Sequence, residues 1–341
     1  MQCGRKARGI KASISKSPGI RTGHLRWYFR MGKTSLASLL SKVFQRSGRS
    51  RPKLARLMIV CPRCGLGNRL RVMVSTIHHA RQLDMQMAHL WLKDAPVRSK
   101  YLFKDEEQGT SRCDFEALFE PIRFCRPFSN SGQSARLLSE HPDLCRQEGM
   151  NIVEEIHFVD GPIREQYRAD VDAILLLTSA SLPITNTIKQ DLYKRFFKPR
   201  KKFLNALDSQ RDILGGRYLS VHLRKDHRTA CGVPEWTQAE MVQATSKLLD
   251  EFGFDRIVVF ADCPEQKAEF MRNDFNGAHL CSVQWGTDDY VENMFLDFLA
   301  ISRASFIAST GLSSFPGEAA IFGGGVPLFD LWHGRQMFPN D

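Results

Sequence analysis

Three short polar stretches in the second half of the chain contain residue types that bind phosphate. HLRKD at 222–226 brings two cations together, ADC at 261–263 supplies a carboxylate, and STGLSSF at 309–315 is rich in hydroxyl groups. Each stretch follows an apolar run of strand length. Cations and hydroxyls bind phosphate oxygens, whereas a carboxylate accepts hydrogen bonds from a base or a sugar. The combination favours a nucleoside diphosphate as ligand.

The third stretch has the order strand, small-residue loop, helix. Gly311 allows close approach of the backbone to a ligand, and a helix N-terminus presents N–H groups that have no intrahelical partner. Hydroxyl groups come from Ser309, Thr310, Ser313 and Ser314. Glu318 stands four residues after Ser314 instead of three, which completes no capping box and leaves the hydroxyls available. The alternative is a connection that only caps its helix.

Structural alternatives exist for the first stretch as well. Arg224 could form a surface ion pair with Asp226, and His222 could be a structural histidine. The coincidence of three polar strand ends favours a binding site, because ligands of parallel sheets gather at the carboxyl ends of the strands.

The elements that must position these residues alternate regularly. Apolar runs predict strands over 217–223, 256–260, 280–283, 306–308 and 326–329, and amphipathic periodicity predicts helices over 236–252, 265–274, 291–303 and 315–322. This alternation is typical of a parallel, doubly wound α/β sheet.

The first half begins in the same way. A strand at 57–60 leads through Gly65-Leu66-Gly67-Asn68 into a helix that runs to about Leu83. This is a Rossmann-like unit, but the third glycine of a dinucleotide site is replaced by Leu70, which argues against NAD binding. Strands are further expected at 85–92, 152–159 and 174–177, a short element at 113–119, a loop at 127–150, and a basic amphipathic helix over 191–214 broken once at Pro199.

No metal site is predicted. Asp170 and Asp172 have the spacing of a D-x-D motif, but they precede an apolar run instead of ending one, so we interpret them as a solvated pair. Cys61 and Cys64 lack a second pair of similar spacing, which favours a buried thiol pair or a local bridge over zinc.

The charge of the chain is concentrated at its start. Residues 1–57 contain fifteen Lys and Arg and no acid, so the formal net charge of +11 becomes about −4 in the rest of the chain, 33 basic against 37 acidic residues. A nucleic-acid-binding body is therefore not expected. Residues 1–53 are expected to be a basic extension, either unstructured or a targeting presequence. No apolar run is long enough for a membrane helix, and the compartment stays open between the cytoplasm, a presequence-directed organelle and the secretory pathway.

Short motifs resemble the fucosyltransferase superfamily that includes protein O-fucosyltransferases and α1,2/α1,6-fucosyltransferases. Gly65 to Arg69 is similar to its first motif, His222-Leu223-Arg224 to its H-x-R motif, and Ser313-Ser314-Phe315 to its S-S/T-F motif. Asp297 is placed like the residue that recognises guanine, and Asp262 like an Asp that follows a strand. The resemblance extends over roughly residues 55–335.

The resemblance implies a GT-B-like fold, in which two Rossmann-like domains face each other across a cleft. Residues 54–214 would form the acceptor-side domain with a linker helix, and 215–341 the GDP-sugar domain. The implied activity is inverting, metal-independent transfer of fucose from GDP-fucose to a glycan or protein hydroxyl. Arg224 and Asn68 would be catalytic; donor binding would fall to Gly65, Gly67, His222, Lys225, Asp262, Asp297, Ser313, Ser314 and Phe315.

Two departures from the family pattern leave an alternative open. Lys225 stands where many members have a second Arg, and Lys lacks the planar fork that grips phosphate. The loop from Cys64 to Asn68 contains no carboxylate, so no general base is assigned. The alternative function is a GDP-sugar-binding relative that does not catalyse and acts as an interaction protein. A nucleic-acid or membrane-surface binder acting through the basic tail is the third hypothesis.

Overall fold

The computed structural model describes ten segments of the chain, and all of them belong to one compact unit, Ser47–Asp341. These segments are residues 57–62, 65–89, 91, 115–127, 152–157, 173–178, 181–224, 237–310, 313–331 and 335–337. The predicted N-terminal extension, the Asp170/Asp172 pair, Cys64 of the cysteine pair and most of the loop expected at 127–150 lie outside them.

The first sheet is parallel and has the strand order β3-β2-β1-β5-β4. Its strands are β1 (Leu57–Pro62), β2 (Gln86–His89), β3 (Cys125–Pro127), β4 (Ile152–His157) and β5 (Ala173–Thr178). The structure confirms four of these strands as predicted, whereas β3 was missed because three residues carry too little periodicity.

Helix α2 (Leu66–Gln82) follows the glycine turn after β1, and α3 (Phe115–Leu118) is a single turn. The helix predicted over 191–214 is three helices: α6 (Asn186–Phe196), α7 (Lys201–Ser209) and α8 (Arg211–Leu214). The predicted break at Pro199 is confirmed, and Pro199 forms a β-bridge with Phe119. The prediction of only one break was wrong, because the amide of Gln210 bonds to the carbonyl of Leu207 and closes a tight turn there.

The second sheet has the order β11-β10-β9-β6-β7-β8. Its strands are β6 (Leu219–Leu223), β7 (Arg256–Ala261), β8 (His279–Cys281), β9 (Phe306–Ser309), β10 (Leu328–Asp330) and β11 (Arg335–Met337). The connecting helices are α10 (Gln238–Phe252), α11 (Pro264–Phe270), α12 (Tyr290–Ser302) and α13 (Ser314–Phe322). Strands and helices thus alternate as predicted.

The second sheet departs from the prediction at one edge, where β11 is antiparallel to β10. The reason is the short connection between them, since a parallel partner would need a long crossover. From β6 the chain winds outward through β7 and β8, then returns to build β9 and β10 on the other side. The point where the winding reverses therefore lies between β6 and β9.

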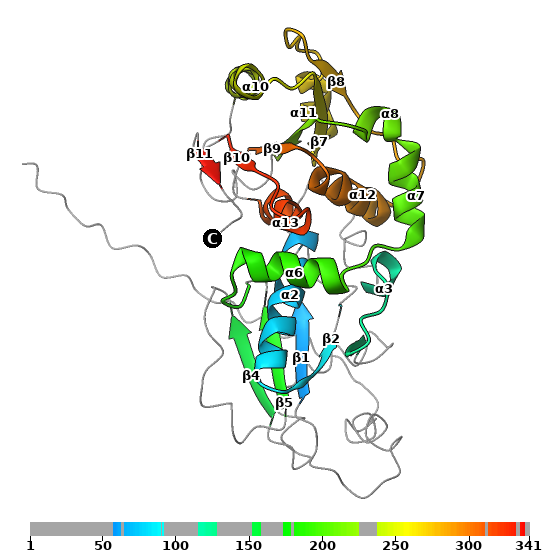
Figure 1. Cartoon of the computed structure of the whole chain (residues 1–341), viewed down its shortest axis with the longest axis vertical. Coiled ribbons are helices and arrows are strands. Elements are labelled where there is room, and N and C mark those ends of the chain that lie inside the picture. The colour runs from blue at the N-terminus through cyan, green and yellow to red at the C-terminus, as the bar shows by residue number, and fades with distance from the viewer. Residues whose placement is uncertain are drawn as a thin grey trace, which may run out of the picture. The chain divides into compact units, whose positions relative to one another are not determined.

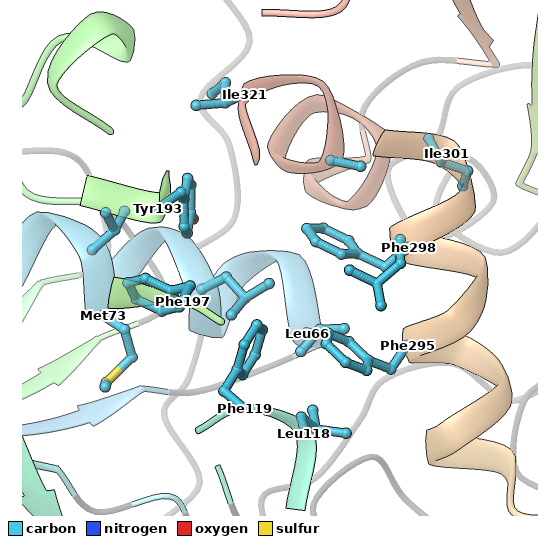
Figure 2. Packing of buried hydrophobic residues seen from close by; sticks show 14 of the residues in the cluster. Leu66, Met73, Leu118, Phe119, Tyr193, Phe197, Phe295, Phe298, Ile301 and Ile321 are labelled. Atoms are coloured by element: carbon cyan, nitrogen blue, oxygen red, sulfur yellow. The ribbon is translucent and has the colours of Figure 1, made fainter. Parts of the chain in front are cut away.

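Two hydrophobic clusters cover the two faces of the second sheet. Leu219, Val221 and Leu223 of β6 point into a cluster with α10, whereas the opposite face packs on α12 and α13. The cluster on that opposite face continues into the first sheet and its helices, and Figure 2 shows members from both halves of the chain, Leu66, Phe119 and Phe298. α2, α6 and α13 pack on one another at its centre (Figure 1). The proposed domain boundary at 214/215 stays a prediction.

Candidate functional site

The ends of β6 and β9 are bonded to each other at the reversal point of the second sheet. The amide of Thr310 donates to the carbonyl of His222 at 3.2 Å, and the amide of Arg224 donates to the Thr310 hydroxyl oxygen at 2.9 Å. β7 ends beside them, since the amide of Asp262 donates to the carbonyl of Leu223 at 3.3 Å. The structure therefore confirms the prediction that the three polar strand ends lie together. In doubly wound sheets this crevice is the usual place for a ligand.

Arg224 connects the side chains of all three strand ends. Its Nη1 donates to Ser313 Oγ at 3.4 Å, and its Nε lies 3.6 Å from Asp262 Oδ2. The Asp262 side chain is only 7% exposed, whereas that of Arg224 is 24% exposed. A guanidinium held from two sides and still reachable from solvent is suited to bind an anion.

His222 lies behind this arginine as a neutral side chain. Burial, with a further contribution from the Arg224 cation, lowers the pKa of His222 to about 3. Its ring centroid is 5.6 Å from that of Phe315. Among the described residues its buried Nδ1 has no hydrogen-bond partner. His222 therefore supplies shape and a polar atom to the site, but no charge.

Ser313 has a structural task in addition to any role in binding. Its Oγ accepts a hydrogen bond from the amide of Phe315 at 3.3 Å and so caps α13. The expectation that the hydroxyls of this loop stay uncommitted was therefore wrong for Ser313, and also for Thr310, whose hydroxyl is bonded to the backbone of Arg224. Ser314 and Phe315 form the first turn of α13 and are half-buried. The backbone ahead of that turn, residues 311–312, lies outside the described segments, as does Lys225.

The glycine turn of the first sheet touches this helix start directly. A Cβ atom on Gly67 would lie 2.7 Å from the carbonyl oxygen of Ser314 and 2.9 Å from the amide nitrogen of Phe315. Only glycine permits such an approach of two backbones. Gly65 is the N-cap of α2, and Asn68 lies in its first turn, partly buried. The structure thus brings the motif at 65–69 into contact with the motif at 313–315.

Asp297 sits on α12 and accepts a hydrogen bond from the indole N–H of Trp285, 2.6 Å from its Oδ1. Burial raises the pKa of the Asp297 carboxyl to about 6, although the Trp285 bond and the Lys267 cation act in the opposite direction. A carboxylate with one indole partner can accept further N–H groups from a nucleobase.

Tyr290 interacts electrostatically both with Asp297 and with the strand-end residues Arg224 and Asp262. Burial, together with the carboxylates of Asp262 and Asp297, raises its pKa, whereas Arg224 lowers it. Its phenol therefore stays protonated in the field of all three groups. Sequence reasoning missed Tyr290, Trp285 and Lys267. No sequence signal singles them out, because none of them ends a strand: Lys267 lies within α11, Tyr290 begins α12, and Trp285 lies in the loop ahead of α12.

The described segments contain no cluster of three or more His, Cys, Asp or Glu with the geometry to hold a metal ion. None of the helices within them combines the length and the apolarity needed to cross a bilayer.

Comparison with solved structures identifies the fold. NodZ, an α-1,6-fucosyltransferase from Bradyrhizobium whose crystals were soaked with GDP-fucose, is 13% identical, with a TM-score of 0.53 over 83% of this chain and 98% of that chain. A variant of Arabidopsis thaliana FUT1 in complex with GDP is 10% identical, with a TM-score of 0.52 over 85% of this chain and 74% of its own. POFUT1 in complex with GDP is 12% identical, with a TM-score of 0.50 over 80% and 95%.

No protein-family profile matches the chain, and no curated protein matches it by sequence. At identities this low the solved structures establish a shared fold. They confirm, at that level, the resemblance to fucosyltransferases expected from the short motifs: a mixed α/β fold with parallel sheets.

Proposed function

We propose that this protein is a glycosyltransferase that transfers fucose from GDP-fucose to a hydroxyl group of a glycan or protein. The observation that carries the proposal is the position of Arg224, between Asp262 and Ser313 at the reversal point of the second sheet. The shared fold supports it, since crystals of NodZ were soaked with GDP-fucose and POFUT1 was crystallised in complex with GDP.

In this proposal the donor diphosphate lies at the N-terminus of α13, where Ser313, Ser314 and the helix N–H groups bind its oxygens. Guanine is recognised by Asp297, whose carboxylate accepts from the N–H groups of the base, and Phe315 contacts the nucleoside. Asn68 and the glycine turn approach the donor from the other side.

The reaction is a single displacement. The acceptor oxygen forms a bond to C1 of fucose as the bond from C1 to the β-phosphate oxygen breaks, which inverts the configuration at C1 and releases GDP. The acceptor proton leaves to solvent or to a base that is not assigned. Negative charge develops on the β-phosphate, and the permanently charged guanidinium of Arg224 stabilises it without a metal ion.

The test is the release of GDP from GDP-fucose in the presence of EDTA. Removal of a preorganised donor of this kind costs roughly 10²–10³ in kcat, so we expect Arg224→Ala to lose that much and Arg224→Lys to retain part. Arg303→Ala is the matched control, because its side chain is 42% exposed and lies 3.8 Å from an exposed Asp208 carboxylate.

Equal turnover by wild type and Arg224→Ala contradicts the mechanism, and so does turnover that requires added metal. Preference for a UDP-sugar contradicts the choice of donor. Binding of GDP by the wild type without turnover on any acceptor supports the non-catalytic alternative, which the substitution at Lys225 motivates.

A further inference from the structure

Glu318 is a charged residue in the interior of the protein. It lies on α13, four residues after Ser314, and is 4% exposed. Residues four apart share one face of a helix, so Glu318 stands one turn below the start of α13 where the donor phosphates are proposed to bind. A buried carboxylate is costly unless the surrounding groups compensate it.

The compensating groups come from the first half of the chain. The Tyr193 hydroxyl donates a hydrogen bond to Glu318 Oε1, and Lys189 Nζ lies 3.6 Å from Oε2. Both partners belong to α6 and are themselves buried. Arg71 on α2 also attracts this carboxylate. Burial raises the pKa of Glu318, and these partners act in the opposite direction.

The same face of α13 is also contacted from the first half at its start. Gly67 lies against the backbone of Ser314 and Phe315, as described above. α13 is thus fixed by the first half at two places one turn apart: by shape at its N-terminus and by charge at Glu318. Helices α2 and α6, which supply these contacts, pack on α13 (Figure 1).

We propose that Glu318, held by Tyr193 and Lys189, is a positioning residue for the donor diphosphate. It fixes the rotation and height of α13, and thereby the place of Ser313, Ser314 and the first N–H groups, while touching no substrate itself. This inference rests on the proposed function. Part of the affinity for the donor diphosphate then depends on Lys189 and Tyr193, which lie in the half of the chain before β6.

The experiment compares GDP with guanosine, which carries the base but no phosphate. Glu318→Gln keeps the shape and an acceptor oxygen for Tyr193 but removes the charge that attracts Lys189. Tyr193→Phe removes only the hydroxyl and is the milder variant if Glu318→Gln folds poorly. Glu292→Gln is the matched control, since it removes the partner of Lys202 from an ion pair in which the lysine is half-exposed.

We expect Glu318→Gln to raise the Kd for GDP and the KM for GDP-fucose about tenfold. The Kd for guanosine should rise by a clearly smaller factor, because Phe315 is the only residue of α13 proposed to contact the nucleoside. Tyr193→Phe should raise the Kd for GDP by a smaller factor, and the double variant should lose less than the product of the two single effects, because both act on one contact. Glu292→Gln should change none of these constants.

Equal losses for GDP and guanosine, or a lower melting temperature with both constants unchanged, would overturn the inference, because a merely structural role predicts them. Those outcomes leave the proposed function intact. A wild-type protein that binds neither GDP nor GDP-fucose overturns both this inference and the proposed function.

Discussion

Two carboxylates in the second half of the chain are placed in similar surroundings and differ in their partners. Glu318 and Asp297 both lie on helices of the second sheet, and burial raises the pKa of each. Glu318 is compensated from within the protein by a tyrosine, a lysine and an arginine. Asp297 has a single hydrogen-bond partner among the described residues, the Trp285 indole, and a more distant attraction to Lys267.

The difference indicates that Glu318 stabilises the arrangement of the helices around the site, whereas Asp297 is available to bind a ligand. A buried carboxylate whose oxygens are fully engaged stabilises one arrangement of helices. A buried carboxylate that keeps acceptor capacity beside Tyr290, which is also within the field of Arg224 and Asp262, is suited to bind a substrate. The following predictions test this distinction.

The largest effect is expected from the contact that fixes α13. Gly67→Ala places a Cβ atom 2.7 Å from a backbone oxygen of Ser314, which cannot turn away as a flexible side chain would. The start of α13 must shift, and a displacement of about 1 Å at a site can cost roughly a hundredfold in rate. We therefore expect about a hundredfold lower kcat/KM for GDP-fucose in steady-state assays.

Gly317→Ala is the control for this substitution, because a Cβ atom at Gly317 on the same helix meets nothing within 4 Å. Unchanged kinetics in Gly67→Ala would show that the two backbones need not touch for activity.

Asp297→Asn should have the next largest effect. The amide keeps the shape of the side chain but loses the charge, and hydrogen bonds to charged groups contribute about 1.5–3 kcal/mol. This corresponds to about a tenfold to hundredfold weaker Kd for both GDP and guanosine, measured by calorimetry. Loss for GDP alone would assign Asp297 to the phosphates and would erase its contrast with Glu318.

The smallest effect concerns pH. The pKa of Asp297 is about 6, raised above its ordinary value, so its protonated form is favoured in the folded protein and its contribution to stability is lost as the pH rises through 6. Binding of base N–H groups requires the ionised form. Affinity for guanosine should therefore fall roughly fourfold between pH 7.5 and pH 5.5, as measured by titration.

Guanosine is the suitable ligand for that titration because it lacks phosphates, which themselves titrate near pH 6. Asp297→Asn should bind with no such pH dependence. The His222 imidazole does not interfere, since its pKa of about 3 lies below this window. A wild-type profile that is flat from pH 5.5 to 7.5 would contradict the role of the carboxylate.

The sequence predicts the parts of this site that depend on local order. His222, Arg224, Asp262 and Ser313 each follow or lie near a strand end, and the alternation of strands and helices is enough to bring such ends together. The glycines at 65 and 67 were likewise recognisable from their spacing after a strand.

What sequence could not predict depends on contacts between distant segments. Glu318 has no local signature, because its partners Lys189 and Tyr193 lie more than a hundred residues earlier. Trp285 and Tyr290 become site residues only once α12 is packed on the sheet. The antiparallel direction of the edge strand β11 follows from a connection of only four residues, 331–334, and no periodicity in the sequence encodes it.

The pairing of β1 with β5 has a consequence for the synthesis of this protein. Leu57 pairs with Ala173, 116 residues later, and Ser314 of α13 follows Leu66 of α2 by 248 residues. At about 5–20 residues per second, β1 emerges from the ribosome on the order of ten seconds before its partner β5. The interval between the synthesis of α2 and that of α13 is longer still. The side of β1 that pairs with β5 and the surface of α2 that packs on α13 are therefore uncovered for much of translation. During that interval they are exposed apolar surfaces of the kind that chaperones bind.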